Sequence, residues 1–224
     1  MALIELQNVV KVYESQAGTV TAIHGVSTSF EEGEFTAIVG PSGCGKTTLL
    51  NAIGGLDRPN QGHIRIDGVN IVDLKDRDLI DFRLQHIGFV FQAYNLIPVL
   101  TALENTGFIL ELQGVSKKER DARAMELLEA VGLADRAHSR PNQLSGGQQQ
   151  RVAVARALAS RPRFVLADEP TANLDSKSTE TLLDIMAALN EKEKTTFIFS
   201  THDQRVIDRA RRILPLEDGQ LKGL

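Results

Sequence analysis

The chain has 224 residues, of which 42% are hydrophobic and 24% are charged, and its formal net charge is −4. This length suits one α/β domain, and this composition argues against intrinsic disorder. The net charge and the lack of a Lys/Arg block give no general electrostatic reason to bind nucleic acid, although a local basic patch would escape this count. We therefore predict one folded domain, residues 1–224, with no nucleic-acid partner.

The cysteine content and the apolar runs indicate where the protein works. The single cysteine, Cys44, excludes an internal disulfide and is typical of a reducing compartment. No apolar run approaches the ~20 residues that span a bilayer. The first residues lack the basic and apolar regions of a signal peptide. We expect a cytoplasmic protein, whose role at a membrane would come through a partner.

The N-terminal part of the chain has the pattern of strands. Residues 3–38 predict short strands separated by turns, among them a turn at Ala17-Gly18. Asp67-Gly68 follows an alternating run at 64–66 and predicts a hairpin. These strands indicate an antiparallel β layer.

A phosphate-binding loop follows the first continuous apolar run, at 35–39, and precedes a helical segment at 48–53. It has the pattern G-x-x-x-x-G-K-[ST] and consists of Gly40, Pro41, Ser42, Gly43, Cys44, Gly45, Lys46 and Thr47. Glycines let backbone N–H groups surround phosphates, Lys46 would neutralise phosphate charge, and the Thr47 hydroxyl would bind Mg²⁺. We expect Thr48 to reach the α-phosphate. The flanking strand and helix argue against a chance glycine-rich turn.

The middle of the chain, roughly residues 95–146, is predominantly helical in pattern. Gln92 stands at its start, after the apolar run 87–91, and by itself indicates little. Ser116 and Glu119 fit a capping box before an apolar stripe at 124, 127, 128 and 131. We predict a helical insertion in the core rather than an independent domain.

The segment Leu144–Arg151 has the sequence LSGGQQQR and precedes a helical run that continues to Leu158. Ser145 and two glycines would expose backbone N–H groups and a free hydroxyl at a helix N-terminus. Such a terminus favours an anion. The segment therefore predicts one half of a phosphate site.

Two further apolar runs, at 164–167 and 196–199, predict strands that are buried on both faces. Each is followed by a helical pattern, so the chain predicts a parallel α/β core. Asp168 and Glu169 end the first of these runs, where an Asp typically holds Mg²⁺ and the next carboxylate can accept a proton from water. An ordinary solvent-facing acidic pair is the weaker alternative. His202 follows the second run and would lie near the γ-phosphate, although a lone histidine is more often structural.

Taken in order, these motifs resemble the nucleotide-binding subunit of ATP-binding cassette (ABC) transporters. The matching motifs are the phosphate loop, Gln92, the segment 144–148, Asp168-Glu169, the segment 173–175 and His202. The resemblance spans nearly the whole chain. It implies a P-loop NTPase fold with a RecA-like parallel-sheet core, an N-terminal antiparallel β layer and a helical subdomain at approximately 95–146.

The resemblance also implies a role for each residue. Glu169 would be the general base, His202 would position the γ-phosphate, and Gln92 would contact Mg²⁺ together with Thr47 and Asp168. Tyr13 would stack on adenine, with a core aromatic residue as the rival interpretation. The residues that would contact ATP held by a second subunit are Ser145, Gly146, Gly147, Gln148 and Asp175. ATP and Mg²⁺ are the implied cofactors.

The implied partners are a second copy, or a homologous ATPase subunit, and an integral membrane permease that contacts the helical subdomain. The chain would then lie on the cytoplasmic face of the inner membrane. Motifs at 54–59, 94–98 and 101–105 are similar to the branch of lipoprotein-release, macrolide-efflux and cell-division ATPases. We expect export or mechanical extraction; a non-transport signalling ATPase and an importer ATPase are the alternatives. A DNA-repair ATPase is disfavoured because no heptad run separates Lys46 from Ser145.

Overall fold

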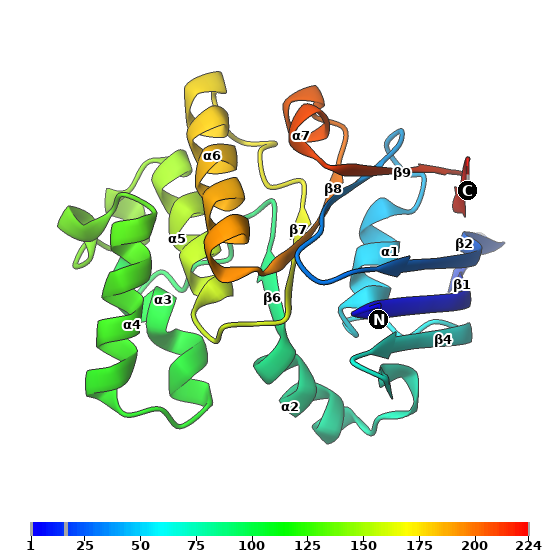
Figure 1. Cartoon of the computed structure of the whole chain (residues 1–224), viewed down its shortest axis with the longest axis horizontal. Coiled ribbons are helices and arrows are strands. Elements are labelled where there is room, and N and C mark those ends of the chain that lie inside the picture. The colour runs from blue at the N-terminus through cyan, green and yellow to red at the C-terminus, as the bar shows by residue number, and fades with distance from the viewer. Residues whose placement is uncertain (1, 16–17, 224) are drawn as a thin grey trace.

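The computed structural model describes residues 2–15 and 18–223, so Ala17 of the predicted turn lies outside the described residues. They form two β-sheets and seven α-helices (Figure 1). The strands are β1 (Ile4–Ser15), β2 (Gly18–Phe30), β3 (Phe35–Val39), β4 (Gln61–Ile66), β5 (Val69–Asn70), β6 (Ile87–Val90), β7 (Phe164–Asp168), β8 (Thr196–Thr201), β9 (Arg212–Glu217) and β10 (Gln220–Leu221). The helices are α1 (Lys46–Ile53), α2 (Asp76–His86), α3 (Ala102–Leu112), α4 (Lys117–Ala130), α5 (Gly146–Leu158), α6 (Ser176–Glu193) and α7 (Gln204–Arg209).

The larger sheet has the order β10-β9-β3-β8-β7-β6 and is parallel except at β10. The three apolar runs of the sequence are its neighbouring strands β3, β8 and β7, and a helix follows each one, as predicted. Because these strands are parallel, their carboxyl ends meet at one edge of the sheet. The phosphate loop, Asp168-Glu169 and His202 all lie where strands end at this edge.

The parallel sheet is buried on both faces. Along β7, Phe164 and Leu166 pack into one hydrophobic cluster, while Val165 and Ala167 pack into the other. The first cluster includes side chains of α1 and of the antiparallel sheet, and the second includes side chains of α5 and α6. This two-sided burial explains why the core strands have continuous apolar sequences.

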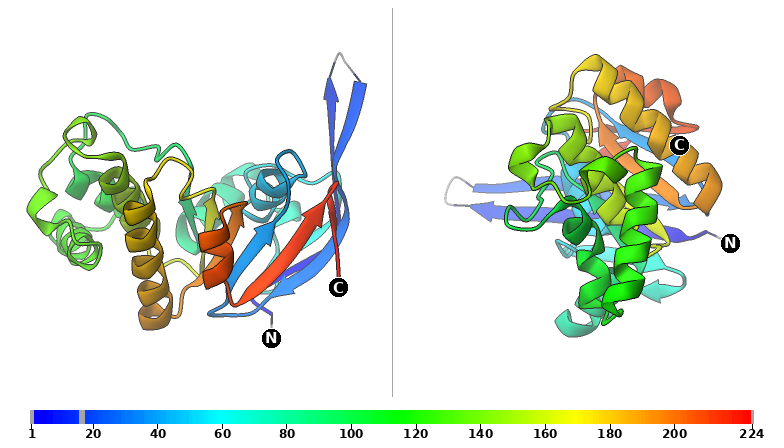
Figure 2. Two further views of the ribbon diagram at one scale, coloured as in Figure 1. Left: turned by 90° about the horizontal axis from the view of Figure 1, so that it is seen from above. Right: turned by 90° about the vertical axis from the view of Figure 1, so that its left-hand side faces the viewer.

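The smaller sheet is antiparallel, with the order β2-β1-β4-β5. The predicted hairpin is confirmed, since Asp67 and Gly68 connect β4 and β5 with φ of 48° and 78°. The prediction of short strands is wrong, because β1 has 12 residues and β2 has 13. Register shifts between Leu6 and Val12 bend this pair without ending it, and its outer half projects as an arm (Figure 2).

Helices α3, α4 and α5 lie together at the end of the molecule away from the β-hairpin arm (Figure 2). Residues 95–101 are not helical, and α3 begins only after Thr101, whose side chain and Glu104 form a capping box. Helix α4 begins after Ser116 as predicted, and its Ala124, Leu127 and Leu128 are buried. Among the described helices, none combines the length and the apolar character that a membrane span requires.

Candidate functional site

The phosphate loop surrounds a cavity of about 270 Å³ at the carboxyl edge of the parallel sheet. Its lining consists of Ala22, Ser42, Gly43, Gly45, Lys46, Thr47, Thr48 and Glu169. Gly45 has a φ of 105°, and a Cβ there would lie 2.5 Å from the Ala22 carbonyl oxygen. A side chain at this position would therefore strain the backbone and collide with β2, so the sequence can form this loop only with glycine.

Lys46 supplies a buried positive charge to the loop. It is 7% exposed, and its Nζ donates hydrogen bonds to the carbonyl oxygens of Gly40, at 2.8 Å, and Pro41, at 3.0 Å. An ammonium group has three N–H donors, so one remains for an anion in the cavity. Cys44, in the same loop, is buried.

The first turn of α1 and the end of β7 meet through oxygen atoms. The Thr47 hydroxyl lies 3.0 Å from each carboxylate oxygen of Asp168. One hydroxyl and one carboxylate, completed by phosphate oxygens and water, form the type of oxygen donor set that Mg²⁺ takes in nucleotide sites. A cluster of three His, Cys, Asp or Glu side chains able to hold a metal is not found among residues 2–15 and 18–223. The site thus fits a cation bound together with a phosphate.

Glu169 lies directly beyond Asp168 with its carboxylate on the same cavity. Its Oε1 is 2.7 Å from Nδ1 of His202, and its Oε2 accepts a longer bond of 3.4 Å from the Thr201 hydroxyl. The Glu169 side chain is 15% exposed, whereas that of His202 is 63% exposed. The structure therefore brings the predicted base and the predicted histidine into direct contact.

The backbone at Glu169 is held in an unusual conformation. Its φ is 44°, in the left-handed region that costs a residue with a side chain about 1 kcal/mol or more. The Glu169 N–H donates to the Ser200 carbonyl oxygen of β8 at 2.9 Å. The turn directs the chain away from β7 immediately after Asp168. The neighbouring carboxylates therefore have different partners, Thr47 for Asp168 and His202 for Glu169.

Gln92 and Tyr13 lie outside the residues that line the cavity. Gln92 is exposed, and its carbonyl oxygen accepts a hydrogen bond from Asn173 Nδ2 at 3.0 Å. Tyr13 is 41% exposed, so the rival interpretation of a core aromatic residue is wrong. Its hydroxyl donates to Asp57 at 2.6 Å, and burial together with this carboxylate raises the pKa of the Tyr13 phenol.

The segment 144–148 forms the N-terminus of α5, away from the cavity. Ser145 Oγ accepts the Gln148 N–H at 3.3 Å, and Gln148 Oε1 accepts the Ser145 N–H at 2.9 Å. The Ser145 oxygen therefore caps the helix, and a hydroxyl that accepts such a bond can still donate its own hydrogen to an anion. A Cβ at Gly146 would lie 2.8 Å from the Tyr94 hydroxyl, and one at Gly147 would lie 2.8 Å from Ser178 Oγ. The two glycines thus permit close packing. Asp175 caps α6, and hydrogen bonds from Ser178 lower the pKa of its carboxyl.

The chain therefore brings together only part of the predicted site. Asp168, Glu169 and His202 lie together beside the phosphate loop. Among the described residues that line the cavity, none comes from the segment 145–148. Sequence reasoning missed Asp57, which holds Tyr13, and Gln150, a buried amide of α5. A signal for Gln150 exists, because it stands three and four residues before the apolar Ala153 and Val154 on one helix face.

Comparisons with known proteins agree with this geometry. Residues 23–172 match a family model described as ABC transporter. The chain is 42% identical over 219 residues to the lipoprotein-releasing system ATP-binding protein LolD of Legionella pneumophila, and the match covers 98% of this chain and 96% of LolD. It is 46% identical over 224 residues to the macrolide export ATP-binding/permease protein MacB of Syntrophobacter fumaroxidans, with 99% of this chain and 31% of MacB covered.

A solved structure is also similar over nearly the whole chain. It is the dimeric ATP-binding cassette MJ0796, of Methanocaldococcus jannaschii, in a post-hydrolysis state bound to ADP and Pi. The TM-score is 0.91 at 46% sequence identity, and the match covers 98% of this chain and 97% of that one.

Proposed function

The chain belongs to the ABC transporter family, and we propose that it is the ATP-hydrolysing subunit of a complex that exports or mechanically extracts its substrate at a membrane. The observation that carries this proposal is the convergence of Lys46, Thr47 and Glu169 on one cavity. The ADP and Pi in the similar MJ0796 cassette support ATP as substrate, and the similarity to LolD, a lipoprotein-releasing system ATP-binding protein, supports the extraction branch.

The phosphate loop would bind ATP. Its N–H groups and the buried Lys46 ammonium face the negative charge of the phosphates without competition from bulk water. Thr47 and Asp168 would hold Mg²⁺, which supplies positive charge against the phosphate oxygens. Tyr13, exposed on β1, would stack on adenine, and the Thr48 side chain hydrogen-bonds the Tyr13 hydroxyl.

Glu169 would act as general base. Its carboxylate accepts a proton from the water that attacks the γ-phosphorus, and the bond from that phosphorus to the bridging oxygen of ADP breaks. The 2.7 Å contact with His202 holds the carboxylate in place. With both ring nitrogens protonated, His202 would donate Nδ1–H to Glu169 and Nε2–H to the γ-phosphate. Gln92 would reach Mg²⁺ and the attacking water once the loop that carries it moves towards the cavity.

The second half of each site would come from another copy of this chain. Ser145, Gly146 and Gly147 stand at an exposed helix N-terminus, where N–H groups favour a phosphate. Gln148 holds Ser145 in place, and Asp175 would contact the facing subunit. The dimeric state of the similar cassette supports this sandwich of two chains around two ATP molecules.

Replacing the base tests the proposed chemistry. We expect Glu169→Gln to bind ATP as the wild type does and to hydrolyse it about 10²–10⁴-fold more slowly, because the amide cannot accept the proton. The variant should accumulate as a dimer with ATP, which size-exclusion chromatography would detect. Glu129→Gln, the same change at an exposed position of α4, should behave as the wild type. Normal hydrolysis by Glu169→Gln would overturn the assignment.

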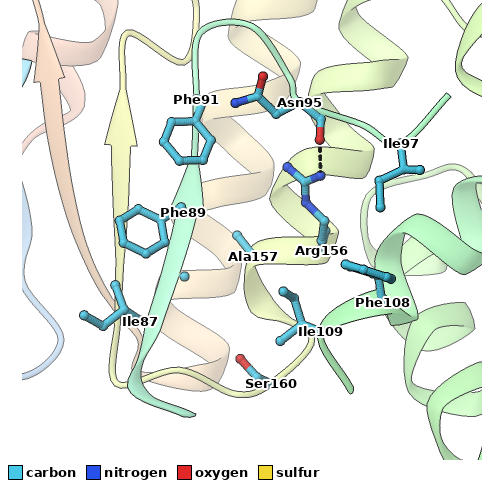
Figure 3. Close-up of a pocket in the computed structure, with 11 residues that line it drawn as sticks. Ile87, Phe89, Phe91, Asn95, Ile97, Phe108, Ile109, Arg156, Ala157 and Ser160 are labelled. Carbon is cyan, nitrogen blue, oxygen red and sulfur yellow. Dashed lines mark hydrogen bonds between the residues drawn. The ribbon is translucent and has the colours of Figure 1, made fainter. Parts of the chain in front are cut away.

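An apolar groove between β6 and α3 is suited to the membrane partner (Figure 3). One cavity of about 300 Å³ and a neighbouring one of about 390 Å³ share Ile87, Phe89 and Ile109, so the two form one groove. Leu112 stands at its rim and is 55% exposed. Such a surface would accept a short amphipathic cytoplasmic helix of a permease. The name of MacB, which joins ATP-binding and permease functions in one chain, supports a partner of this kind.

A charge in the groove tests this docking. Leu112→Glu should abolish co-purification with the membrane permease, because burying the carboxylate against the apolar groove is unfavourable. ATP hydrolysis by the isolated chain should remain at the wild-type rate. Ile213→Glu, an equivalent change at a residue that is 45% exposed on β9, should leave co-purification intact. Retained co-purification of Leu112→Glu would exclude the groove as the docking site.

A further inference from the structure

Gln150 is a buried amide in the middle of α5. The residue is 0% exposed, and the fully buried Val152, Ala153 and Val154 follow it in the helix. Burying an amide costs free energy unless hydrogen bonds replace those to water. The partners of this amide therefore indicate what the residue does.

The amide nitrogen of Gln150 joins two loops of the candidate site. Its Nε2 donates to the Pro170 carbonyl oxygen at 2.7 Å and, more weakly, to the Phe91 carbonyl oxygen at 3.4 Å. Pro170 directly follows Glu169, and Phe91 directly precedes Gln92. Both acceptors are carbonyls, so only the NH₂ group can face them, and the orientation of the amide is determined. One side chain of α5 thus holds the backbone next to the general base and next to the glutamine.

The oxygen atom of the Gln150 amide does not offset the cost of burying the side chain. Gln150 Oε1 is buried and has no hydrogen-bond partner among the described residues. A buried polar atom without a partner costs about 1–3 kcal/mol, so a purely structural role would favour an apolar side chain here. The two loop contacts are the feature that distinguishes glutamine from an apolar residue of equal length.

Helix α5 holds the Gln92 loop at further points. Arg156, six residues beyond Gln150, donates through Nη2 to the Tyr94 carbonyl oxygen at 2.9 Å, and Gly146 packs against the Tyr94 hydroxyl. Tyr94 has a φ of 42°, so this loop needs external support to keep its conformation. The helix therefore connects the segment 145–147 at its N-terminus with both catalytic loops beside it.

We propose that Gln150 is a positioning residue that fixes the Glu169 turn and the Gln92 loop relative to the helix that carries Ser145. When the helix N-terminus contacts a phosphate, the amide transmits its position to the loops on both sides. This inference rests on the proposed ATPase function. It predicts that losing the Gln150 amide slows hydrolysis while the phosphate loop, on β3 and α1, still binds ATP.

The test compares Gln150→Met with the wild type in the full chain. Methionine keeps the length of the side chain and removes both donors. We expect the dissociation constant for ATP to stay within about twofold and kcat to fall about 10–100-fold, since a misplacement of 1 Å at a reacting group costs up to about 10²-fold. In the Glu169→Gln background, the same change should raise the ATP concentration needed for dimer formation, which a merely destabilised protein would not show after correction for its folded fraction.

Asn190→Leu is the matched control. Asn190 is also a buried amide, and its Nδ2 donates to the carbonyl oxygens of Gly33 and Thr195 at the opposite edge of the sheet. It should lower the midpoint of thermal unfolding without changing kcat per folded chain. Gln150→Asn, which shortens the amide by one methylene, serves if the methionine variant fails to fold.

The outcomes separate the two hypotheses. If the wild type hydrolyses ATP and both Gln150→Met and Gln150→Asn retain its kcat and its ATP-driven dimerisation, the positioning role is wrong. If Asn190→Leu lowers kcat per folded chain as much as Gln150→Met does, the effect is general destabilisation and the positioning role is also wrong. If the wild type does not hydrolyse ATP, the proposed function itself fails, whatever Gln150 does.

Discussion

At the scale of single residues, Asp203 connects the two segments that carry the candidate catalytic groups. It directly follows His202, and its Oδ2 accepts the hydroxyl of the buried Thr171 at 2.8 Å. Arg205 donates to the same carboxylate through its backbone N–H and its guanidinium. These bonds, led by those from the Arg205 side chain, lower the pKa of Asp203 to about 2.

The low pKa of Asp203 predicts how stability depends on pH. The native pKa lies below the ordinary value of 3.8, so the charged carboxylate stabilises the fold by about 2 kcal/mol above pH 5. This contribution is lost as the pH falls from about 4 towards 2. Asp203→Asn should therefore lower the free energy of unfolding at pH 7, and its deficit should shrink between pH 5 and pH 3 in urea titrations. A deficit for Asp203→Asn that stays constant between pH 5 and pH 3 would contradict this assignment.

At the scale of elements, the strands that could be predicted are those that a short contiguous sequence pattern determines. Buried parallel strands need apolar residues on both faces, so β3, β7 and β8 were predictable, and with them the edge where Lys46 and Glu169 meet. Strand β9 was not, because Pro215 interrupts its pattern. The structure accommodates this proline because β9 pairs with β3 only as far as Pro215 and has just the two-residue β10 on its other side.

The candidate site likewise has a local part, which a short sequence pattern determines, and long-range contacts, which it does not. The phosphate loop is local, so its geometry follows from glycine and lysine spacing in one segment. The contacts of Gln150 join residues that are 59 and 20 positions away, and those of Tyr13 with Asp57 span 44 positions. No pattern in one segment encodes such pairs. The capping bond of Ser145 was also missed, because a serine before two glycines suits either a cap or a free anion site.

At the scale of the whole molecule, the phosphate loop and Ser145 do not line the same cavity of one chain. The phosphate loop lies at the carboxyl edge of the sheet, and Ser145 lies exposed at the end of α5. If each site is completed by a second copy, hydrolysis requires dimers, and the activity per chain should rise with protein concentration until dimers saturate.

Mixing two inactive variants distinguishes a shared site from a site within one chain. Glu169→Gln lacks the base, and Ser145→Arg lacks the serine contact, while both retain the phosphate loop. In a mixed dimer, the intact Glu169 of one chain faces the intact Ser145 of the other. With random pairing, about half the dimers are mixed and each has one intact site, so the mixture should recover about a quarter of the wild-type rate if the sites act independently. A mixture no more active than its components, in the presence of demonstrated mixed dimers, would show that Ser145 and Glu169 do not serve one shared site.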